Sequence, residues 1–377
     1  MIKIKTKDIF SNCILLVFCF VIIAEFYGII SIRTSQILIM AFGAVSMTYY
    51  CGIRKDLRIY TTYYTTFLVF YFWGGLLSWI YNGNADFIEL LWPVAFMGVS
   101  TVLLFGNVST KMTSLIFFVY CAITVFLIFQ RGGADYLGGT SSRNSVSVFV
   151  VLFLIMHLIA AFQNKKSVPI YYGLIAFVTC FAAIGRSGII ISVVIICIFC
   201  LIRFENGQSY IRNIKIFAWT ILIIVVFYQV IMRLEPELID NAIGNLMWRG
   251  LESKRTIMWS DYLSKSFSSF GNVIFGAKIS GTQLLDFYNS NLHNSFLMLH
   301  AKYGAFVFLI VVVLMIKSLF YYYKEKNYFY FSSLVLCIIR MNFDYTNFNG
   351  ILDTILVVLL LYPLYSKQQI KRGIEEK

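Results

Sequence analysis

The sequence predicts an all-α polytopic membrane protein, with about twelve transmembrane helices and one large loop outside the bilayer. Of its 377 residues, 59% are hydrophobic and only 13% are charged, whereas a soluble domain has roughly a quarter of its residues charged. Apolar runs recur that are long enough to cross a hydrocarbon core of ~30 Å as helices. One long polar interval, from about residue 233 to 292, interrupts them.

The predicted spans are the apolar runs that remain when the chain is divided at polar residues. They are 8–30, 36–51, 59–80, 88–105, 112–130, 145–162, 168–185, 187–203, 214–232, 293–316, 327–341 and 351–365. The second and eleventh are short, as expected of tilted or re-entrant segments. The first follows three lysines but is longer than the apolar core of a signal peptide and has no clear cleavage site, so we expect a retained span.

The formal charge of +13 predicts orientation rather than a nucleic-acid partner, because short cytoplasmic loops of membrane proteins are enriched in Lys and Arg. With the amino terminus in the cytoplasm, the short loops alternate consistently and both termini are cytoplasmic. The chain then divides into residues 1–232 with spans one to nine, an external loop or cap at 233–292, and 293–377 with spans ten to twelve and a cytoplasmic tail. No nucleic-acid binding is expected, because no basic surface with interleaved aromatic residues occurs outside the loops.

The external interval has the composition of a folded cap, since aromatic residues such as Trp248, Trp259 and Tyr262 supply apolar anchors. A helix is predicted over 253–267, lying along the membrane surface. Three glycines, Gly271, Gly276 and Gly281, predict turns after it.

Arginines at the ends of the apolar runs are the first candidates for binding an anion. Arg186 lies between two apolar runs and is followed closely by Gly188, so its charge lies beside a backbone that a ligand can approach. A guanidinium binds a diphosphate bidentately. Because one arginine cannot neutralise a diphosphate, the other candidates to share the binding are Arg131, Arg143, Arg255 and Arg340. An interfacial arginine that only snorkels is the competing interpretation.

The three histidines differ in context. His293 lies at the boundary between the polar interval and a span, where an imidazole meets both water and an anionic substrate. His300 follows seven residues later on the same helical face, and His157 lies deep in an apolar run; packing is the expected role of both.

Several chemistries have no motif in this chain. H-E-x-x-H, a pair of C-x-x-C motifs with metal spacing, a Walker loop and a G-x-S-x-G elbow are all absent from the sequence. The C-x-x-C of Cys197 and Cys200 lies inside an apolar run, where a thiolate is costly. We therefore expect no metal, no cofactor, no ATP use and no serine-hydrolase chemistry.

The order of these motifs resembles the O-antigen polymerase and ligase superfamily of bacterial envelope polysaccharide synthesis. The resemblance covers about residues 145–310 and depends on five elements: Arg186-Ser-Gly opening a span, Arg255-x-x-x-Trp259, Phe275-Gly276, His293-Asn294 and Gly304. Ligases of the superfamily share a pattern that begins with His and then Asn, Ser or Gln. After nine more residues comes Gly, and after two more residues comes Gly, Thr or Tyr. Here the last position is Val307, and neither Arg186 nor Arg255 is followed by Leu four residues later. The resemblance is therefore stronger to the polymerase branch, called Wzy-type.

The resemblance implies a metal-independent glycosyltransferase of the bacterial inner membrane. Its donor is a polyprenyl-diphosphate-linked oligosaccharide such as one on undecaprenyl diphosphate, and the growing chain is transferred to a new lipid-linked repeat unit at the periplasmic face, in O-antigen or lipopolysaccharide biosynthesis. The lipid bilayer, a chain-length regulator and a flippase are the implied partners.

The site residues follow from combining the resemblance with the chemistry. His293, Arg186 and Arg255 are the expected catalytic residues, with the arginines on the diphosphate and the imidazole on the acceptor hydroxyl. The expected substrate-binding residues are Arg131, Arg143, Asn144, Asn294 and Arg340.

Two alternatives remain open. One is an O-antigen ligase or capsule polymerase of the same superfamily, with the same donor and another acceptor. The other is a transporter of lipid-linked sugar, although this chain has most of its ionisable residues at the ends of the spans and in loops, whereas a transporter carries them near the bilayer midplane.

Overall fold

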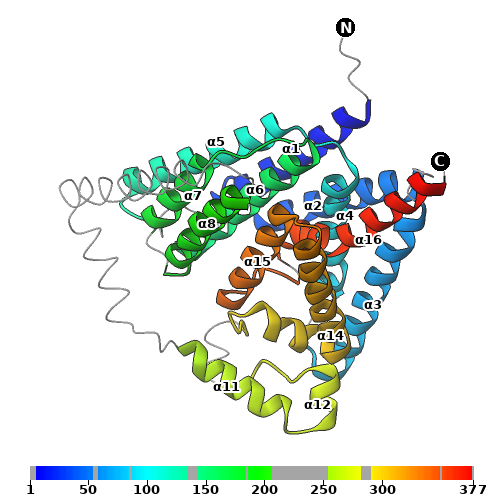
Figure 1. The fold of residues 1–377 in the computed structure, drawn as a ribbon. Helices are drawn as coiled ribbons and strands as arrows, with labels where there is room; N and C mark the ends of the chain where they lie inside the picture. Colours follow the sequence, from blue (N-terminus) through cyan, green and yellow to red (C-terminus); the bar gives the residue numbers. More distant parts are fainter. Residues whose placement is uncertain are drawn as a thin grey trace.

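The fold consists of α-helices packed side by side, as a computed structural model of the chain shows (Figure 1). It describes residues 6–53, 58–84, 87–134, 137, 143–183, 186–205, 254–281, 290–348 and 350–375. No strand occurs within these ranges. The all-α prediction is confirmed for this part of the chain, while the predicted span at 214–232 lies outside it.

Eleven of the twelve predicted apolar runs coincide with a helix. Before the polar interval the helices are α1 (Thr6–Phe26), α2 (Ile32–Met47, continued by a π-helix over Thr48–Ile53), α3 (Arg58–Asn82), α4 (Phe87–Phe105), α5 (Thr110–Arg131), α6 (Arg143–Gln163), α7 (Tyr171–Ala182) and α8 (Arg186–Glu205). After it come α14 (Ser295–Lys324), α15 (Tyr328–Phe343) and α16 (Asp353–Glu375). The helix α14 continues eight residues beyond the predicted end at 316.

Four of the described helices are long and apolar enough to cross a membrane: α1, α5, α6 and α14. Shorter apolar helices of 10–17 residues fall within α4, α7, α8, α15 and α16. The chain is thus a helical protein with the apolar helices of a multi-pass membrane protein. The total of twelve crossings, the cytoplasmic termini and the placement of residues 233–292 outside the bilayer remain predictions.

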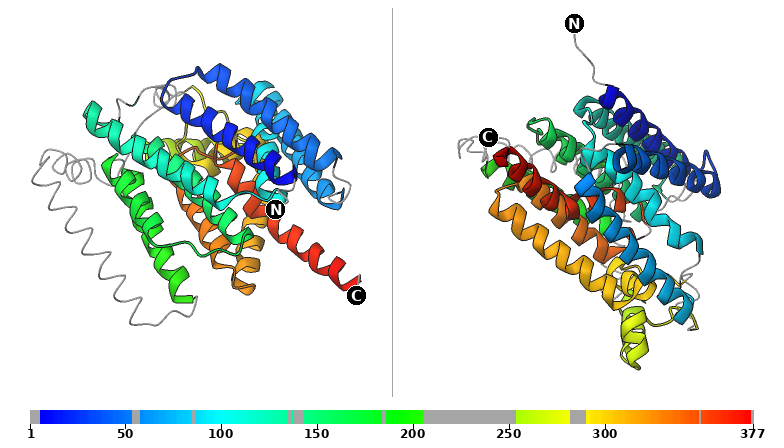
Figure 2. Two further views of the ribbon diagram at one scale, coloured as in Figure 1. Left: turned by 90° about the horizontal axis from the view of Figure 1, so that it is seen from above. Right: turned by 90° about the vertical axis from the view of Figure 1, so that its right-hand side faces the viewer.

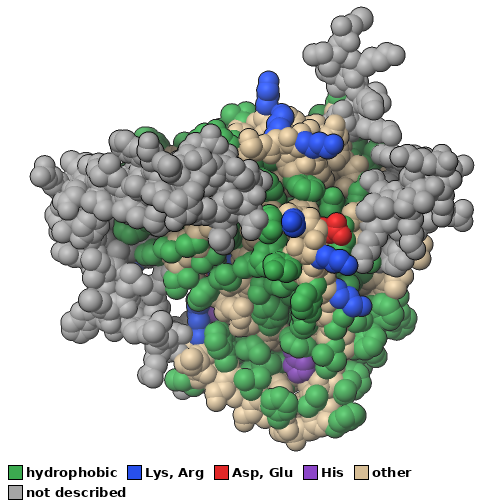
Figure 3. Space-filling view, in the orientation of Figure 1, with side chains coloured by type: hydrophobic (Ala, Val, Ile, Leu, Met, Phe, Trp, Pro, Cys, Tyr) green, Lys and Arg blue, Asp and Glu red, His purple; other side chains and the backbone are tan. Residues whose placement is uncertain are grey.

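Burial divides the helices into a central one and peripheral ones. In α6 every side chain from Val146 to Ala161 is buried, and 89% of its most apolar window lies inside the protein. The corresponding share is 33% for both α5 and α14. Their outward faces carry apolar side chains such as Phe126 and Phe320, and the space-filling view shows hydrophobic side chains over much of the visible surface (Figure 3). An apolar outer face of this kind is expected of helices that contact lipid.

A break divides α14 near its first third. Gly304 has φ 75° and ψ 175° inside the helix, a conformation that favours glycine. A Cβ at this position would lie 2.4 Å from the carbonyl oxygen of Ile274. The Ala301 carbonyl, just before the break, accepts hydrogen bonds from the side chains of Ser78 and Asn82 on α3. The glycine thus lets the end of α12 pack directly against the broken helix.

Two helices of the polar interval lie beside the start of α14, at the end of the bundle away from the chain termini (Figures 1 and 2). They are α11 (Lys254–Ser266) and α12 (Phe270–Phe275), and α11 confirms the helix predicted over 253–267. Gly276 and Gly281 have positive φ in turns, as predicted. The turn predicted at Gly271 is wrong, because this glycine lies in the first turn of α12. A Cβ at this position would lie 2.3 Å from the Tyr81 hydroxyl oxygen, so a larger residue would displace the end of that side chain.

Candidate functional site

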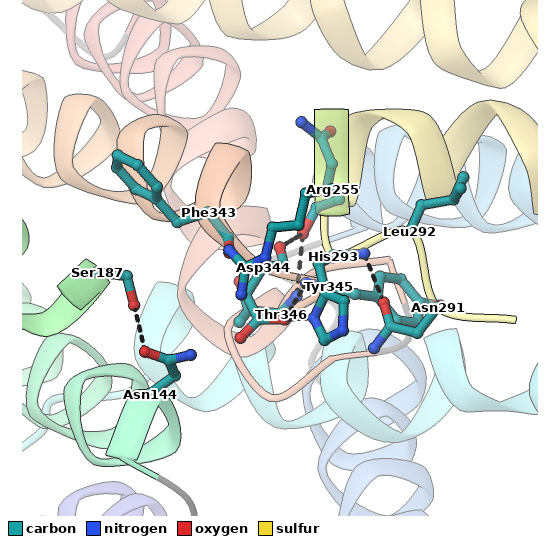
Figure 4. A network of polar contacts seen from close by, with 12 residues as sticks. Asn144, Ser187, Arg255, Asn291, Leu292, His293, Phe343, Asp344, Tyr345 and Thr346 are labelled. Carbon is teal, nitrogen blue, oxygen red and sulfur yellow. Dashed lines mark hydrogen bonds and ion pairs between the residues drawn. The ribbon is translucent and has the colours of Figure 1, made fainter. Parts of the chain in front are cut away.

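Four helix starts meet the end of a fifth helix. The first turns of α6, α8, α11 and α14 are connected by hydrogen bonds to one another or to the last turn of α15 and the residues directly after it (Figure 4). Each helix start carries a partial positive charge from its unpaired N–H groups. The four helix starts therefore contribute partial positive charge to the junction, which the partial negative charge at the end of α15 offsets only in part.

His293 and Asp344 form the centre of this site. The Nδ1 atom of His293 lies 3.0 Å from Oδ1 of Asp344, and both side chains are largely buried, with 23% and 19% exposed. The backbone of His293, just before α14, has a φ of 50°. This left-handed conformation is costly for a residue with a Cβ. Its backbone N–H is held by the side-chain oxygen of Asn291 at 2.8 Å. The histidine is therefore fixed from both its backbone and its ring.

The charge state of Asp344 follows from its neighbours. Burial raises the pKa of the carboxyl group, but the hydrogen bond from His293 and the charges of Arg340 and Arg255 outweigh burial and lower the pKa to about 2. The carboxylate is therefore ionised at neutral pH and accepts a hydrogen bond from Nδ1–H of His293. This places the basic lone pair of the imidazole on Nε2, the arrangement found where a carboxylate orients a general base.

Arg340 is the most buried charge of the site, with 0% of its surface exposed. Its Nη2 atom donates to the backbone oxygen of Asn144 at 3.2 Å and lies 3.6 Å from Oδ2 of Asp344. Its Nε and Nη1 atoms are buried and have no hydrogen-bond partner among the described residues. Buried donors are nearly always paired in native proteins, so this guanidinium has the capacity to bind an anion through the three N–H groups on these two nitrogens.

The helix α11 contributes Arg255 and Trp259, four residues apart on one face. Nη1 of Arg255 donates to the carbonyl of Phe343 at 2.6 Å, and Nε1 of Trp259 donates to the carbonyl of Leu292 at 2.7 Å. One contact fixes the residue before Asp344 and the other fixes the residue before His293. The Arg-x-x-x-Trp pair thus holds the two partners of the central hydrogen bond in position.

His300, on α14, contacts the second half of α11 and also α12. Its Nδ1 atom lies 2.7 Å from the Tyr262 hydroxyl on α11, and its Nε2 atom lies 2.8 Å from the carbonyl oxygen of Val273 on α12. Both ring nitrogens are therefore engaged in packing α11 and α12 against α14.

Asn144 connects α8 to the site. Its side-chain oxygen accepts a hydrogen bond from the Ser187 hydroxyl at 2.9 Å, while its backbone oxygen accepts from Arg340. Arg186, the first residue of α8, precedes Ser187 directly. A chain of contacts therefore runs from the start of α8 through Asn144, Arg340 and Asp344 to His293, and Arg186 begins its helix on the same side of the bundle as the histidine.

The remaining predicted residues lie around this chain. Arg143 is the exposed first residue of α6 and adjoins Asn144. Arg131 ends α5 and donates to the carbonyl of Leu137 at 2.8 Å. Asn294 is the N-cap of α14, and its side-chain oxygen accepts from the backbone N–H groups of Phe296 and Leu297. Its carboxamide oxygen is thus used to begin the helix that follows His293.

Asp344 and Ser295 belong to the site but were not among the residues selected from the sequence. The Ser295 hydroxyl donates to the backbone oxygen of Asp344 at 2.8 Å and accepts from the N–H of Thr346 at 3.0 Å. The signal that points to Asp344 is an acidic residue four positions after Arg340, at the end of an apolar run. Asp344 is the C-cap of α15 in an extended conformation, and its side chain turns back to within 3.6 Å of the Arg340 guanidinium.

The described residues contain no cluster of three or more His, Cys, Asp or Glu side chains that would hold a metal ion. What the site offers is two guanidinium groups, four helix starts, and an imidazole oriented by a carboxylate. Groups of these kinds are able to bind an anion and to accept a proton beside it. No model of a known protein family matches the chain, and no curated protein matches it either.

Proposed function

We propose that this chain is a polymerase of bacterial surface polysaccharide, of the O-antigen type. In this proposal it transfers a glycan chain from polyprenyl diphosphate to a sugar hydroxyl of a new lipid-linked repeat unit, at the periplasmic face of the inner membrane. The observation that carries the proposal is the buried Arg340, whose Nε and Nη1 atoms have no hydrogen-bond partner among the described residues, beside Arg255 and the His293–Asp344 pair.

The charge balance of the site supports an anionic substrate group. Arg255 and Arg340 bring two positive charges, and Asp344 brings one negative charge. Arg143 and Arg186 begin the neighbouring helices α6 and α8. A diphosphate carries more than one negative charge and accepts bidentate hydrogen bonds from guanidinium groups. A site with this surplus binds the diphosphate of the donor and stabilises the charge that grows on it as the sugar leaves.

The imidazole supports a transfer to a hydroxyl. In the proposed step, the acceptor hydroxyl oxygen forms a bond to the anomeric carbon of the donor sugar, and the bond from that carbon to the diphosphate oxygen breaks. The proton of the hydroxyl moves to Nε2 of His293, and polyprenyl diphosphate leaves with the bonding electron pair. Asp344 stabilises the imidazolium that results. The arginines take the role that a divalent cation has in other diphosphate-releasing transferases.

The profile of surface polysaccharide from a strain that lacks the gene tests the proposal. Loss of a polymerase leaves single repeat units on the surface, and restoring the wild-type gene returns a ladder of long chains. Long chains that accumulate unattached in the deletion strain would instead indicate the ligase. An unchanged ladder would contradict both. A capsule polymerase would change the capsule and leave the lipopolysaccharide ladder intact.

A further inference from the structure

A second hollow lies at the opposite end of the bundle from the candidate site. It has a volume of about 790 Å³ and is formed where α4 and α6 end, where α15 begins and along one face of α16. Asn144 of the site lies in the first turn of α6, and Gln163, which lines the hollow, ends the helix. At about 1.5 Å per residue the two ends of α6 are separated by about 30 Å, the thickness of a hydrocarbon core. The hollow is therefore a separate feature at the other face of the membrane.

The lining combines cations with aromatic rings. Lys165, Lys166 and Ser167 form one side, and the aromatic residues are Phe105, Phe162, Phe329, Tyr362 and Tyr365. No acidic residue is among the described residues that line it. Lys166 is fixed by a 2.7 Å hydrogen bond from Nζ to the Thr110 hydroxyl. Lysines beside aromatic rings at the level of the lipid headgroups are suited to an anionic amphiphile.

Gln163 adds a polar atom whose partner is not in the described protein. Its Nε2 atom donates to the carbonyl of Leu103 at 2.5 Å, which fixes the carboxamide. Its Oε1 atom is buried and has no hydrogen-bond partner among the described residues. A buried acceptor is normally paired, so this oxygen has a place for a donor such as a hydroxyl group.

We propose that this hollow binds the headgroup of an anionic glycerophospholipid that carries hydroxyl donors, as phosphatidylglycerol does. Lys165 and Lys166 bind the phosphodiester, Gln163 accepts a hydrogen bond from a headgroup hydroxyl, and the aromatic rings contact the glycerol backbone and the upper acyl chain. The site is independent of the proposed polymerase chemistry, because the two lie at opposite ends of α6.

Native mass spectrometry of the purified full-length protein in detergent tests this site. Phosphatidylglycerol, phosphatidylcholine and inorganic phosphate are titrated separately. We expect phosphatidylglycerol to bind at least tenfold more tightly than phosphatidylcholine, and inorganic phosphate not to displace it at equal concentration, because phosphate alone lacks the aromatic contacts. Equal binding of the two lipids would overturn the proposal. Displacement by phosphate would show that the hollow is a site for a soluble anion instead.

The double variant Lys165→Ala/Lys166→Ala is expected to lose about tenfold or more in affinity for phosphatidylglycerol. Lys324→Ala/Lys326→Ala is the matched control, since it removes two exposed lysines outside the lining, and Lys326 shares with Lys165 a φ of 52°. Equal losses in both variants would contradict a defined site. If the first variant does not fold, the wild-type protein is titrated with both lipids at increasing salt concentration instead. Its preference for phosphatidylglycerol must then fall as ionic strength rises. A constant preference would overturn the proposal.

Discussion

His293 and Asp344 lie 51 positions apart in the chain, and their side chains share a 3.0 Å hydrogen bond at the junction of α14 and α15. The backbone around each partner is fixed separately. Trp259 holds the residue before His293, Arg255 holds the residue before Asp344, and Ser295 connects the two segments. The geometry of the proposed base therefore depends on α11, although that helix is distant in sequence from α15.

Asp344→Asn tests the orientation of the imidazole. An amide in this position stabilises an imidazolium less and also presents N–H groups to the ring, so we expect polymerisation to fall by roughly 10²- to 10⁴-fold. The rate of chain extension by purified protein measures this loss. Asp261→Asn, a change of the same kind on α11, is the control and is expected to keep wild-type activity. Wild-type activity in Asp344→Asn would show that the carboxylate has no part in the reaction.

Arg340→Lys separates charge from hydrogen-bond geometry. Lysine keeps the positive charge near Asp344 but lacks the planar guanidinium, so we expect the protein to accumulate normally and activity to fall at least tenfold. Arg340→Ala also leaves a buried carboxylate with fewer partners, and we expect it to lose about 3–5 kcal/mol of stability. Thermal unfolding and activity are measured together. A fully active Arg340→Lys protein would mean that only the charge matters here.

Trp259→Phe removes one N–H donor and keeps an aromatic ring. The carbonyl of Leu292 then loses its 2.7 Å hydrogen bond, which we expect to cost about 1 kcal/mol of stability. We expect activity to fall by more than the loss of folded protein explains. The reason is that His293 follows Leu292 directly, so a shift of Leu292 also moves the imidazole. Trp73→Phe, at a side chain that is 55% exposed, is the control and should change neither quantity. Equal behaviour of the two variants would argue against a positioning role for Trp259.

The pKa of Asp344 predicts a pH dependence of stability. The folded protein lowers it from 3.8 to about 2, so the ionised carboxylate stabilises the fold by about 2 kcal/mol above pH 4. This contribution is lost as the pH falls from about 4 to 2, because the carboxyl group becomes protonated in the folded protein too. Thermal unfolding of wild type and Asp344→Asn at a series of pH values checks the sign. Their difference should shrink as the pH falls below 4, and a difference that grows there would contradict the prediction.

Gly304→Ala tests the break in α14. Alanine at φ 75° is strained, and its Cβ would lie 2.4 Å from the carbonyl oxygen of Ile274. We expect a loss of more than about 2 kcal/mol of stability, because both backbone strain and a steric clash contribute. Gly83→Ala has a similar φ of 70° with open space around the Cβ, so it measures the strain alone and should cost only about 1 kcal/mol. Equal losses would show that the close approach at Gly304 is unimportant.

The sequence predicts the helices of the apolar spans well, because each of these spans is a nearly uninterrupted apolar run. The polar residues at helix ends were also predictable: His293 and Arg255 were selected because each stands where an apolar or helical segment begins. Asp344 was missed because its importance comes from a contact between segments far apart in the chain. The only local signal is its position four residues after Arg340 at the end of an apolar run, and that spacing alone does not separate it from a solvated acidic residue.

The role of Asn294 shows a second limit. Next to His293 it reads as a residue for sugar or for the imidazole, but its side-chain oxygen caps α14. Asparagine is among the preferred residues at an N-cap, and the long apolar run that follows it is the local signal for this structural role. The break at Gly304 could not be located from periodicity, because the apolar pattern continues through it.

Chain extension by the purified protein, with a polyprenyl-diphosphate-linked repeat unit as both donor and acceptor, tests the central claim most directly. Wild type, His293→Gln and Arg340→Lys are compared at equal amounts of folded protein. We predict long glycans with release of polyprenyl diphosphate from the wild type, and at least a tenfold lower rate from both variants. Wild-type rates in both variants, or no extension by the wild type, would contradict the assignment of anion binding and proton transfer to this site.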